Sequence, residues 1–167
     1  MTRRAGRAVL AGALALLMGA CALLADPGRI AIGTPATQVL QALGPPTARY
    51  PGPVGERMQY SQEPAGQRVF NLDLDHQGRV AHVEQALADG LFPQRIETGR
   101  WQREDVLREY GAPARIIQVH NFAGDIWVWR YLQGPIWRLL FIDIDHAGLV
   151  RGWSTGDEGL PDVSDSR

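Results

Sequence analysis

The sequence contains a single cysteine, no lysine and little net charge, and each shortage narrows the classes of protein that it can encode. One cysteine, Cys21, excludes an internal disulfide framework and a metal site built from several cysteines. A formal net charge of −1 over 167 residues argues against nucleic-acid binding, which usually needs a strongly basic surface. With 45% hydrophobic residues, the chain can bury a real core, as one domain or as two very small ones.

Familiar catalytic motifs are also missing. The sequence has no serine in a Gly-x-Ser-x-Gly turn, no Walker-type phosphate loop and no His-Glu-x-x-His zinc motif. The pairs Asp75-His76 and Asp145-His146 invite a catalytic or metal interpretation, but adjacent strand residues point to opposite faces. We therefore predict a protein that is not an enzyme and that needs no cofactor or metal. A small periplasmic hydrolase with an unrecognised site remains an alternative.

The N-terminus has the pattern of an export segment. A region with three arginines precedes an uncharged apolar run over residues 8–18, and small residues then lead to Cys21. Met18-Gly19-Ala20-Cys21 resembles the lipobox of bacterial lipoproteins, which implies that Cys21 is acylated and becomes the mature N-terminus. Cleavage after Ala25 and an uncleaved membrane anchor over residues 8–25 are the alternatives.

The lipoprotein interpretation divides the N-terminal region into a signal peptide, residues 1–20, and an acylated tether, residues 21–29. Two or more acyl chains make membrane anchoring stable. Ala22 follows the cysteine where an aspartate would retain the protein in the inner membrane. By resemblance to enteric lipoproteins, this residue implies attachment to the outer membrane, on its periplasmic side.

An internal repeat organises the rest of the chain. Residues 72–80 and 142–150 are identical at five of nine positions. Residues 39–46 match residues 106–113, and Met58-Gln59-Tyr60 matches Trp129-Arg130-Tyr131. The sequence therefore predicts module 1 over residues 30–88, a linker over 89–95, module 2 over 96–157 and a polar tail over 158–167.

Each module is predicted to be a short helix followed by antiparallel strands, which makes the fold class α+β. The helices span Pro35–Leu43 and Arg103–Tyr110, and a glycine ends each one. Alternating apolar residues then indicate strands. The strands meet in matching hairpin turns, where aspartate accepts local hydrogen bonds and glycine takes positive φ. The turn residues are Asp75, Gly78, Asp145 and Gly148.

This pattern of glycines, helix and hairpin resembles the SmpA/OmlA lipoprotein domain, also called the BamE-like domain, in two tandem copies. The matching residues are Gly33, Val39, Gly44, Tyr60, Gly78 and Val80, then Gly99, Val106, Gly111, Trp129, Tyr131, Gly148 and Val150. The resemblance implies one or two helices on a three-stranded antiparallel sheet in each module. Single-copy family members act in the complex that inserts β-barrels into the outer membrane. The tandem pair also resembles the β-lactamase inhibitory proteins, whose joined sheets form a concave binding face.

Module 2 contains all five tryptophans, and strand alternation separates them into two faces. Trp129 and Tyr131 are predicted to lie in the core under the helices. The opposite face is predicted to be an apolar patch that binds a partner, a second copy included, or is covered by module 1 or the linker. Its residues are Trp137, Leu139, Phe141, Ile126 and Val128. The corresponding face of module 1, with Gln67, Val69 and Asn71, is predicted to be an ordinary wetted surface.

These inferences predict an outer-membrane-anchored periplasmic lipoprotein that binds protein as an accessory or scaffold component of β-barrel assembly or envelope integrity. An enzyme-binding module of the β-lactamase-inhibitor kind is the alternative. The expected partners are an outer-membrane or periplasmic protein and the membrane itself, through the N-terminal lipid, with no nucleic acid. A soluble periplasmic or secreted location is the alternative to the lipid anchor.

Overall fold

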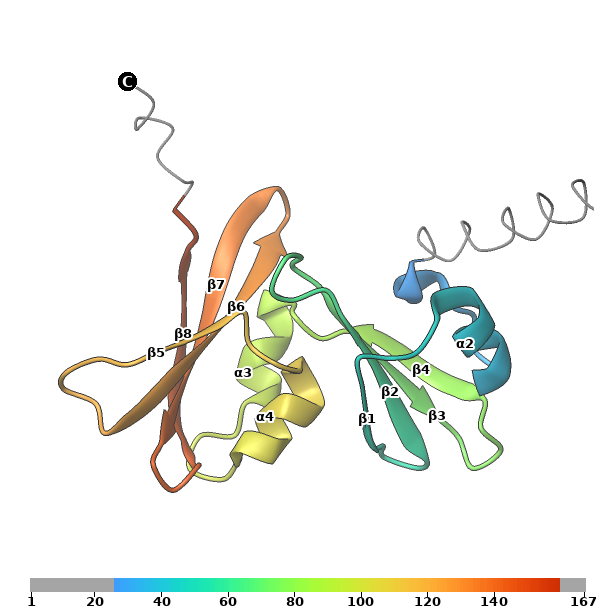
Figure 1. The fold of residues 1–167 in the computed structure, drawn as a ribbon, viewed down its shortest axis with the longest axis horizontal. Helices are drawn as coiled ribbons and strands as arrows, with labels where there is room; N and C mark the ends of the chain where they lie inside the picture. Colours follow the sequence, from blue (N-terminus) through green and yellow to red (C-terminus); the bar gives the residue numbers. More distant parts are fainter. Residues whose placement is uncertain (1–25, 160–167) are drawn as a thin grey trace, which may run out of the picture.

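The computed structural model describes residues 26–159, which form two antiparallel sheets with short helices (Figure 1). The predicted α+β class with two tandem modules is confirmed. Module 1 contains η2 (Pro27–Arg29), α2 (Ala36–Leu43), β1 (Ala48–Pro51), β2 (Glu56–Ser61), β3 (Val69–Leu74) and β4 (Val80–Gln85). Then follow η3 (Asp89–Leu91), α3 (Phe92–Arg95), α4 (Arg103–Tyr110), β5 (Arg115–Ile117), β6 (Gly124–Gln133), β7 (Ile136–Asp145) and β8 (Val150–Asp157). Cys21, the predicted signal peptide and the end of the tail lie outside the described residues.

Each sheet has four strands rather than the three that the family resemblance implied, because β1 and β5 are added at one edge. Both strands follow a helix-ending glycine and a proline, and the residue before a proline is restricted to extended backbone. The extended chain then pairs with the next strand in both modules. The Thr47 amide donates to the Gln59 carbonyl, and the Ala114 amide donates to the Val128 carbonyl, each over 2.8 Å.

The two modules repeat the same backbone contacts, as the sequence repeat predicted. The Gly33 amide donates to the Val80 carbonyl over 2.7 Å, and the Gly99 amide donates to the Val150 carbonyl over 2.8 Å. A register shift interrupts the last hairpin of each module at matching positions, Asp73/Leu74 and Asp143/Ile144. The repeat is therefore a repeat of structure as well as of sequence.

One part of the predicted repeat alignment is wrong by two residues. Tyr60 lies opposite Phe70, and Trp129 lies opposite Leu140, so Tyr60 corresponds to Trp129 rather than to Tyr131. The offset between the modules rises from 67 residues at β1 and β5 to 69 at β2 and β6, because the loop over residues 118–123 is two residues longer than the loop over residues 52–55. The match of Tyr60 to Tyr131 required an offset of 71. Two residues are one full period of a strand, so the faces assigned to Trp129 and Tyr131 are unchanged.

The helix boundaries agree closely with the sequence signals. Helix α4 spans Arg103–Tyr110 as predicted. Helix α2 starts at Ala36, one residue later than predicted, because Pro35 is extended and forms a β-bridge with Arg79. The glycines that end α2 and α4 have φ of 77° and 69°, which a residue with a Cβ rarely adopts.

Helices and sheets alternate along the long axis of the molecule (Figure 1). Helix α2 covers one face of sheet β1–β4, while α3 and α4 lie between the two sheets. The described residues of the two sheets share no strand pairing, unlike the joined sheets that the second resemblance implied. The predicted core of module 2 is buried against α3 and α4. It includes Trp129, Tyr131, Leu140, Ile142 and Ile144.

The predicted linker is a structural part of module 2. Residues 89–95 form η3 and α3, and Phe92 is fully buried. The Phe92 ring makes edge contacts with Tyr131 at 5.2 Å between centroids and with Tyr110 at 5.9 Å. Glycine and proline suggested a loop here, but Pro93 occupies the first turn of α3, where a missing N–H costs nothing.

The matching hairpin turns permit a paired stability test. Gly78 has φ of 70° and Gly148 has φ of 88°, while the carboxylates of Asp75 and Asp145 accept amide hydrogen bonds across the two turns. No atom outside the turns lies close enough to clash with an added Cβ at either glycine. We expect Gly78→Ala and Gly148→Ala each to lower the free energy of unfolding by about 1 kcal/mol, through backbone strain alone. Urea denaturation measures both, and a neutral Gly148→Ala beside a damaging Gly78→Ala would contradict the equivalence of the turns.

Candidate functional site

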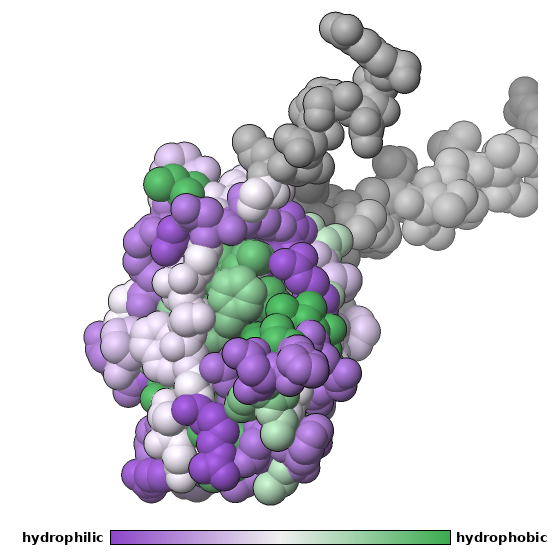
Figure 2. Space-filling view, turned by 90° about the vertical axis from the view of Figure 1, so that its left-hand side faces the viewer, coloured by the Kyte–Doolittle hydropathy of each residue, from purple (hydrophilic) through white to green (hydrophobic). Residues whose placement is uncertain are grey.

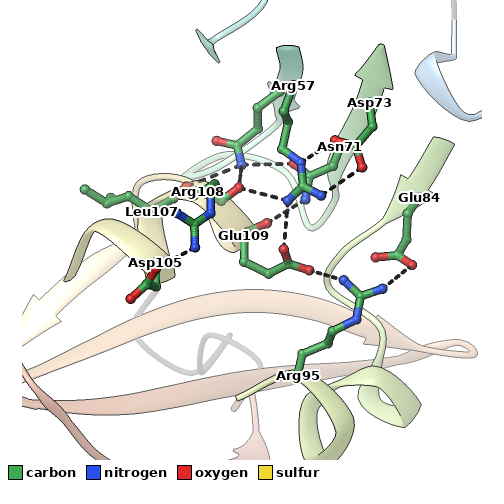
Figure 3. Close-up of polar contacts among 10 residues, drawn as sticks. Arg57, Asn71, Asp73, Glu84, Arg95, Asp105, Leu107, Arg108 and Glu109 are labelled. Atoms are coloured by element: carbon green, nitrogen blue, oxygen red, sulfur yellow. Dashed lines mark hydrogen bonds and ion pairs between the residues drawn. The ribbon is translucent and has the colours of Figure 1, made fainter. Parts of the chain in front are cut away.

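The face of sheet β1–β4 that is turned away from α2 is buried, although it was predicted to be wetted. Asn71 is 1% exposed, Gln59 is 1% exposed and Val69 is fully buried. The prediction was wrong because α4 and α3 of module 2 cover this face, and their polar groups satisfy its side chains (Figure 3). A polar face can be buried at little cost when each group finds a hydrogen-bond partner.

Arg57 is the centre of this buried interface. Its guanidinium makes two parallel hydrogen bonds to the carboxylate of Asp73, over 2.6 and 2.9 Å. Its Nη1 donates to the carboxylate of Glu109 in α4 over 2.8 Å. Burial by itself lowers the pKa of Arg57, but the hydrogen bonds that Arg57 donates to Asp73 and Glu109 raise the pKa above its usual value. Arg57 therefore stays charged and joins a strand of module 1 to a helix of module 2.

Amide side chains of module 1 cap the C-terminal end of α4. The last carbonyls of a helix have no partner within the helix. Gln59 Nε2 donates to the Arg108 carbonyl over 3.2 Å, and Asn71 Nδ2 donates to the Glu109 carbonyl over 2.9 Å. Gln59 Oε1 would lie 2.7 Å from a Cβ added at Gly111, so the glycine after α4 also makes room for the cap.

Arg95 in α3 extends the ion network toward the surface. Its two terminal nitrogens donate to Glu109 and Glu84, each over 2.7 Å (Figure 3). The network thus runs from Asp73 through Arg57, Glu109 and Arg95 to Glu84. This network was not predicted from the sequence. Opposite charges on two neighbouring strands could have suggested an Arg57–Asp73 pair, but no sequence signal indicates that α4 would cover the pair.

The predicted partner-binding residues all lie on the face of sheet β5–β8 that is turned away from α3 and α4. We call this surface the outer face. Trp137 is 41% exposed, Phe141 and Ile126 are half-buried, and Leu139 and Val128 are buried within the patch. Figure 2 shows hydrophobic side chains gathered in the middle of this side of the molecule, bordered by hydrophilic ones. The structure therefore brings the predicted set together on one surface.

Arg130 connects the outer face to module 1. Its guanidinium carbon lies 5.3 Å from the centre of the Trp137 ring, and its Nε donates to Glu158 over 2.6 Å. The Arg130 backbone amide donates to Glu63 over 2.8 Å, from the loop between β2 and β3. Burial raises the pKa of Glu63 to about 7, against the lowering effect of the Arg130 contacts.

The raised pKa of Glu63 predicts a specific pH dependence. The folded protein holds a proton on Glu63 that the unfolded chain, with an ordinary pKa, releases. This stabilisation is therefore fully present below pH 4.5 and is lost as the pH rises through about 7. As the pH rises from 5 to 8, the free energy of unfolding of Glu63→Gln should therefore increase by about 1–2 kcal/mol relative to that of the wild-type protein. This magnitude is discounted for the partial exposure of Glu63.

The exposed Glu104 provides the control for this measurement, because it lies on α4 away from the loop. Urea denaturation of Glu104→Gln at the same pH values should follow the wild-type curve within about 0.5 kcal/mol. An equal pH response of Glu63→Gln and the wild-type protein would refute the assignment to Glu63.

The Asp75-His76 and Asp145-His146 pairs lie in the two hairpin turns. His76 and His146 are exposed in the hairpin turns, and the Asp145 carboxylate is occupied by Leu149 N–H and Arg151. Within residues 26–159, no three His, Cys, Asp or Glu side chains are grouped so that they could hold a metal ion. None of the helices formed by these residues is long and apolar enough to cross a membrane.

Comparisons with known proteins give one distant structural similarity. No family model and no curated protein sequence matches the chain. The crystal structure of a DUF4309 family protein from Bacillus subtilis aligns over 73% of this chain and 77% of that chain, with 15% sequence identity and a TM-score of 0.32. A similarity of this size does not identify a family for the chain.

Proposed function

We propose that this chain is an outer-membrane-anchored periplasmic lipoprotein that binds a protein partner through the outer face and acts as an accessory or scaffold component of envelope assembly. The observation that supports binding is the apolar outer face of sheet β5–β8, with the large aromatic Trp137 41% exposed beside it. The lipid anchor rests on the sequence around Cys21. The envelope role rests on the resemblance to BamE-like modules.

The position of the network around Arg57 supports the choice of this face. The network uses the buried face of sheet β1–β4 to hold the two modules together, so that face is occupied within the chain. The outer face has no such cover from α2 or α4. Exposed apolar patches with central aromatic residues are typical of protein interfaces, where a few aromatics supply most of the binding energy.

The lipid anchor gives the first test. If Cys21 is the acylated terminus, the purified mature protein should carry the mass of a diacylglyceryl group and should fractionate with membranes. Cys21→Ala should accumulate as an uncleaved or mislocalised precursor, since signal peptidase for lipoproteins needs the cysteine. A soluble mature protein whose N-terminus is residue 26 would refute the anchor.

The binding role is tested by Trp137→Ala combined with Phe141→Ala. Affinity capture from detergent-solubilised membranes should recover a component of the β-barrel assembly machinery with the wild-type chain. The double variant should lose at least tenfold in capture, which is about 1.4 kcal/mol. Val54→Ala, which removes an apolar side chain 56% exposed on module 1, is the control and should capture normally.

Two other outcomes would overturn this proposal. Unfolding of the double variant, seen by circular dichroism, would show that the outer face is internal core. Tight capture of a soluble enzyme in place of an assembly component would favour the inhibitor-type alternative.

A further inference from the structure

The outer face of module 2 is the structural counterpart of the buried polar face of module 1. In sheet β1–β4, Arg57 lies opposite Asp73. In sheet β5–β8, Ile126 lies opposite Asp143 at the matching position, beside the register shift that both hairpins share. The next row matches in the same way. The cross-strand pair of Gln59 and Asn71 in module 1 corresponds to the pair of Val128 and Phe141 in module 2. The pair of Ser61 and Val69 corresponds to the pair of Arg130 and Leu139.

The counterpart face in module 1 is occupied by a helix. The C-terminal half of α4 lies across it, with its carbonyls on Gln59 and Asn71 and its Glu109 on Arg57. The molecule therefore already contains one example of this sheet surface covered by a helix. A sheet face in a globular protein is buried under a helix or a second sheet, so this example indicates how an equivalent face is covered.

The outer face of module 2 has apolar residues where module 1 has polar ones, but it keeps one aspartate. The three positions that bond to α4 in module 1 are Arg57, Gln59 and Asn71, and module 2 has Ile126, Val128 and Phe141 there. Asp143 retains the acid of Asp73 but has lost the arginine beside it. None of the ion pairs among residues 26–159 includes Asp143. Burial raises the pKa of Asp143, as expected for a carboxylate without a counter-charge.

We propose that the outer face binds an amphipathic α-helix of a partner protein in the position that α4 has on module 1. Apolar side chains of this helix would contact Ile126 and Phe141, and an arginine or lysine would pair with Asp143. This inference rests on the proposed function and specifies the kind of partner. The apolar replacements favour an apolar helix face, and the unpaired carboxylate favours a cation supplied from outside.

A second copy of this chain fits the face poorly. Its α2, the counterpart of α4, has the sequence Ala-Thr-Gln-Val-Leu-Gln-Ala-Leu and carries no basic residue for Asp143. Its most apolar residue, Val39, is fully buried against its own sheet. A separate protein with a basic amphipathic helix satisfies both requirements.

Site-specific photo-crosslinking in cells that make the full chain tests this inference. p-Benzoyl-phenylalanine is placed at position 137 or 141, with position 37 on the exposed side of α2 as control. Circular dichroism of each purified chain verifies the fold. Mass spectrometry of the crosslinked peptides should locate both crosslinks in one partner segment, at residues three or four apart or multiples of that spacing, with an arginine or lysine on the same helical face.

The carboxylate is tested in the same cells. Asp143→Asn should lower the crosslinking yield from position 141 at least threefold, because the cation of the partner loses its counter-charge. Glu104→Gln, which neutralises an exposed acid on α4, is the matched control and should leave the yield unchanged. An equal effect of the two substitutions, or none, would overturn the role assigned to Asp143.

The remaining outcomes separate the inference from the proposed function. Crosslinks to a partner at alternate residues would indicate an extended strand and would overturn the helix while leaving the binding role intact. Crosslinks to residues 1–25 or 160–167, or to another copy of this chain, would overturn the inference by identifying a different occupant. Yields no higher than those from position 37 would overturn both proposals.

Discussion

Arg57→Ala is expected to lower the free energy of unfolding by about 3–5 kcal/mol, the usual cost of removing one partner from a buried ion pair. Arg57 is 7% exposed and is hydrogen-bonded to Asp73, Glu109 and the Arg108 carbonyl. Alanine leaves the buried carboxylate of Asp73 without a cation and removes one of the two cations that face Glu109, which keeps Arg95. Because these groups come from both modules, we expect the variant to lose the cooperative unfolding of the two modules as well. Urea denaturation followed by circular dichroism and by tryptophan fluorescence measures both effects, since all five tryptophans are in module 2.

Arg49 provides a matched control on the neighbouring strand. It pairs with Glu56 over 2.5 Å, but both side chains are more than 40% exposed. Exposed pairs contribute little, so Arg49→Ala should cost less than about 1 kcal/mol and should unfold in one transition. Similar losses for Arg49→Ala and Arg57→Ala would mean that the buried network does not hold the modules together.

Phe92→Ala is expected to be equally damaging, with a loss of about 3–5 kcal/mol, the range for a fully buried aromatic residue. Phe92 packs edge-on against Tyr110, Tyr131 and Trp153, so that alanine leaves a cavity between α3, α4 and the sheet. Thermal unfolding of the full chain, with the tryptophan fluorescence of module 2 as the signal, measures the loss.

Ile136 is the control for this prediction, because it is a large apolar residue 54% exposed in the hairpin between β6 and β7. Ile136→Ala should change the stability by less than about 0.5 kcal/mol, as expected for a surface substitution. A Phe92→Ala variant as stable as Ile136→Ala would contradict the assignment of residues 89–95 to the core of module 2.

Local signals in the sequence were sufficient for helices α2 and α4, for the hairpin turns and for the faces of the predicted strands. Gly44 and Gly111 end their helices because only glycine tolerates the positive φ found there. Trp129 was assigned to the correct face even though its repeat partner was misaligned by two residues, because side chains alternate with a period of two. Such signals depend on a few neighbouring residues, and the tertiary structure does not alter them.

Part of the outer face was also predicted from the sequence. Trp137 and Phe141 fall on the same side of β7 by simple alternation, and the structure places them together with Ile126 of β6. The sequence repeat already matches Asp143 to Asp73, but only the strand register shows that Arg57 lies opposite Asp73 while Ile126 lies opposite Asp143.

The sequence by itself determined the two longer helices, α2 and α4, the hairpin turns and which side chains of each predicted strand share a face. Only the tertiary structure decided that the polar face of module 1 is buried and that residues 89–95 belong to the core of module 2. A strand face with Arg57, Gln59 and Asn71 is equally suited to water and to a hydrogen-bonded interface. Whether such a face is exposed or buried depends on whether donors and acceptors from distant parts of the chain form hydrogen bonds with it. Here the C-terminal carbonyls of α4 and the carboxylate of Glu109 do so, from positions 38 to 52 residues further along the chain.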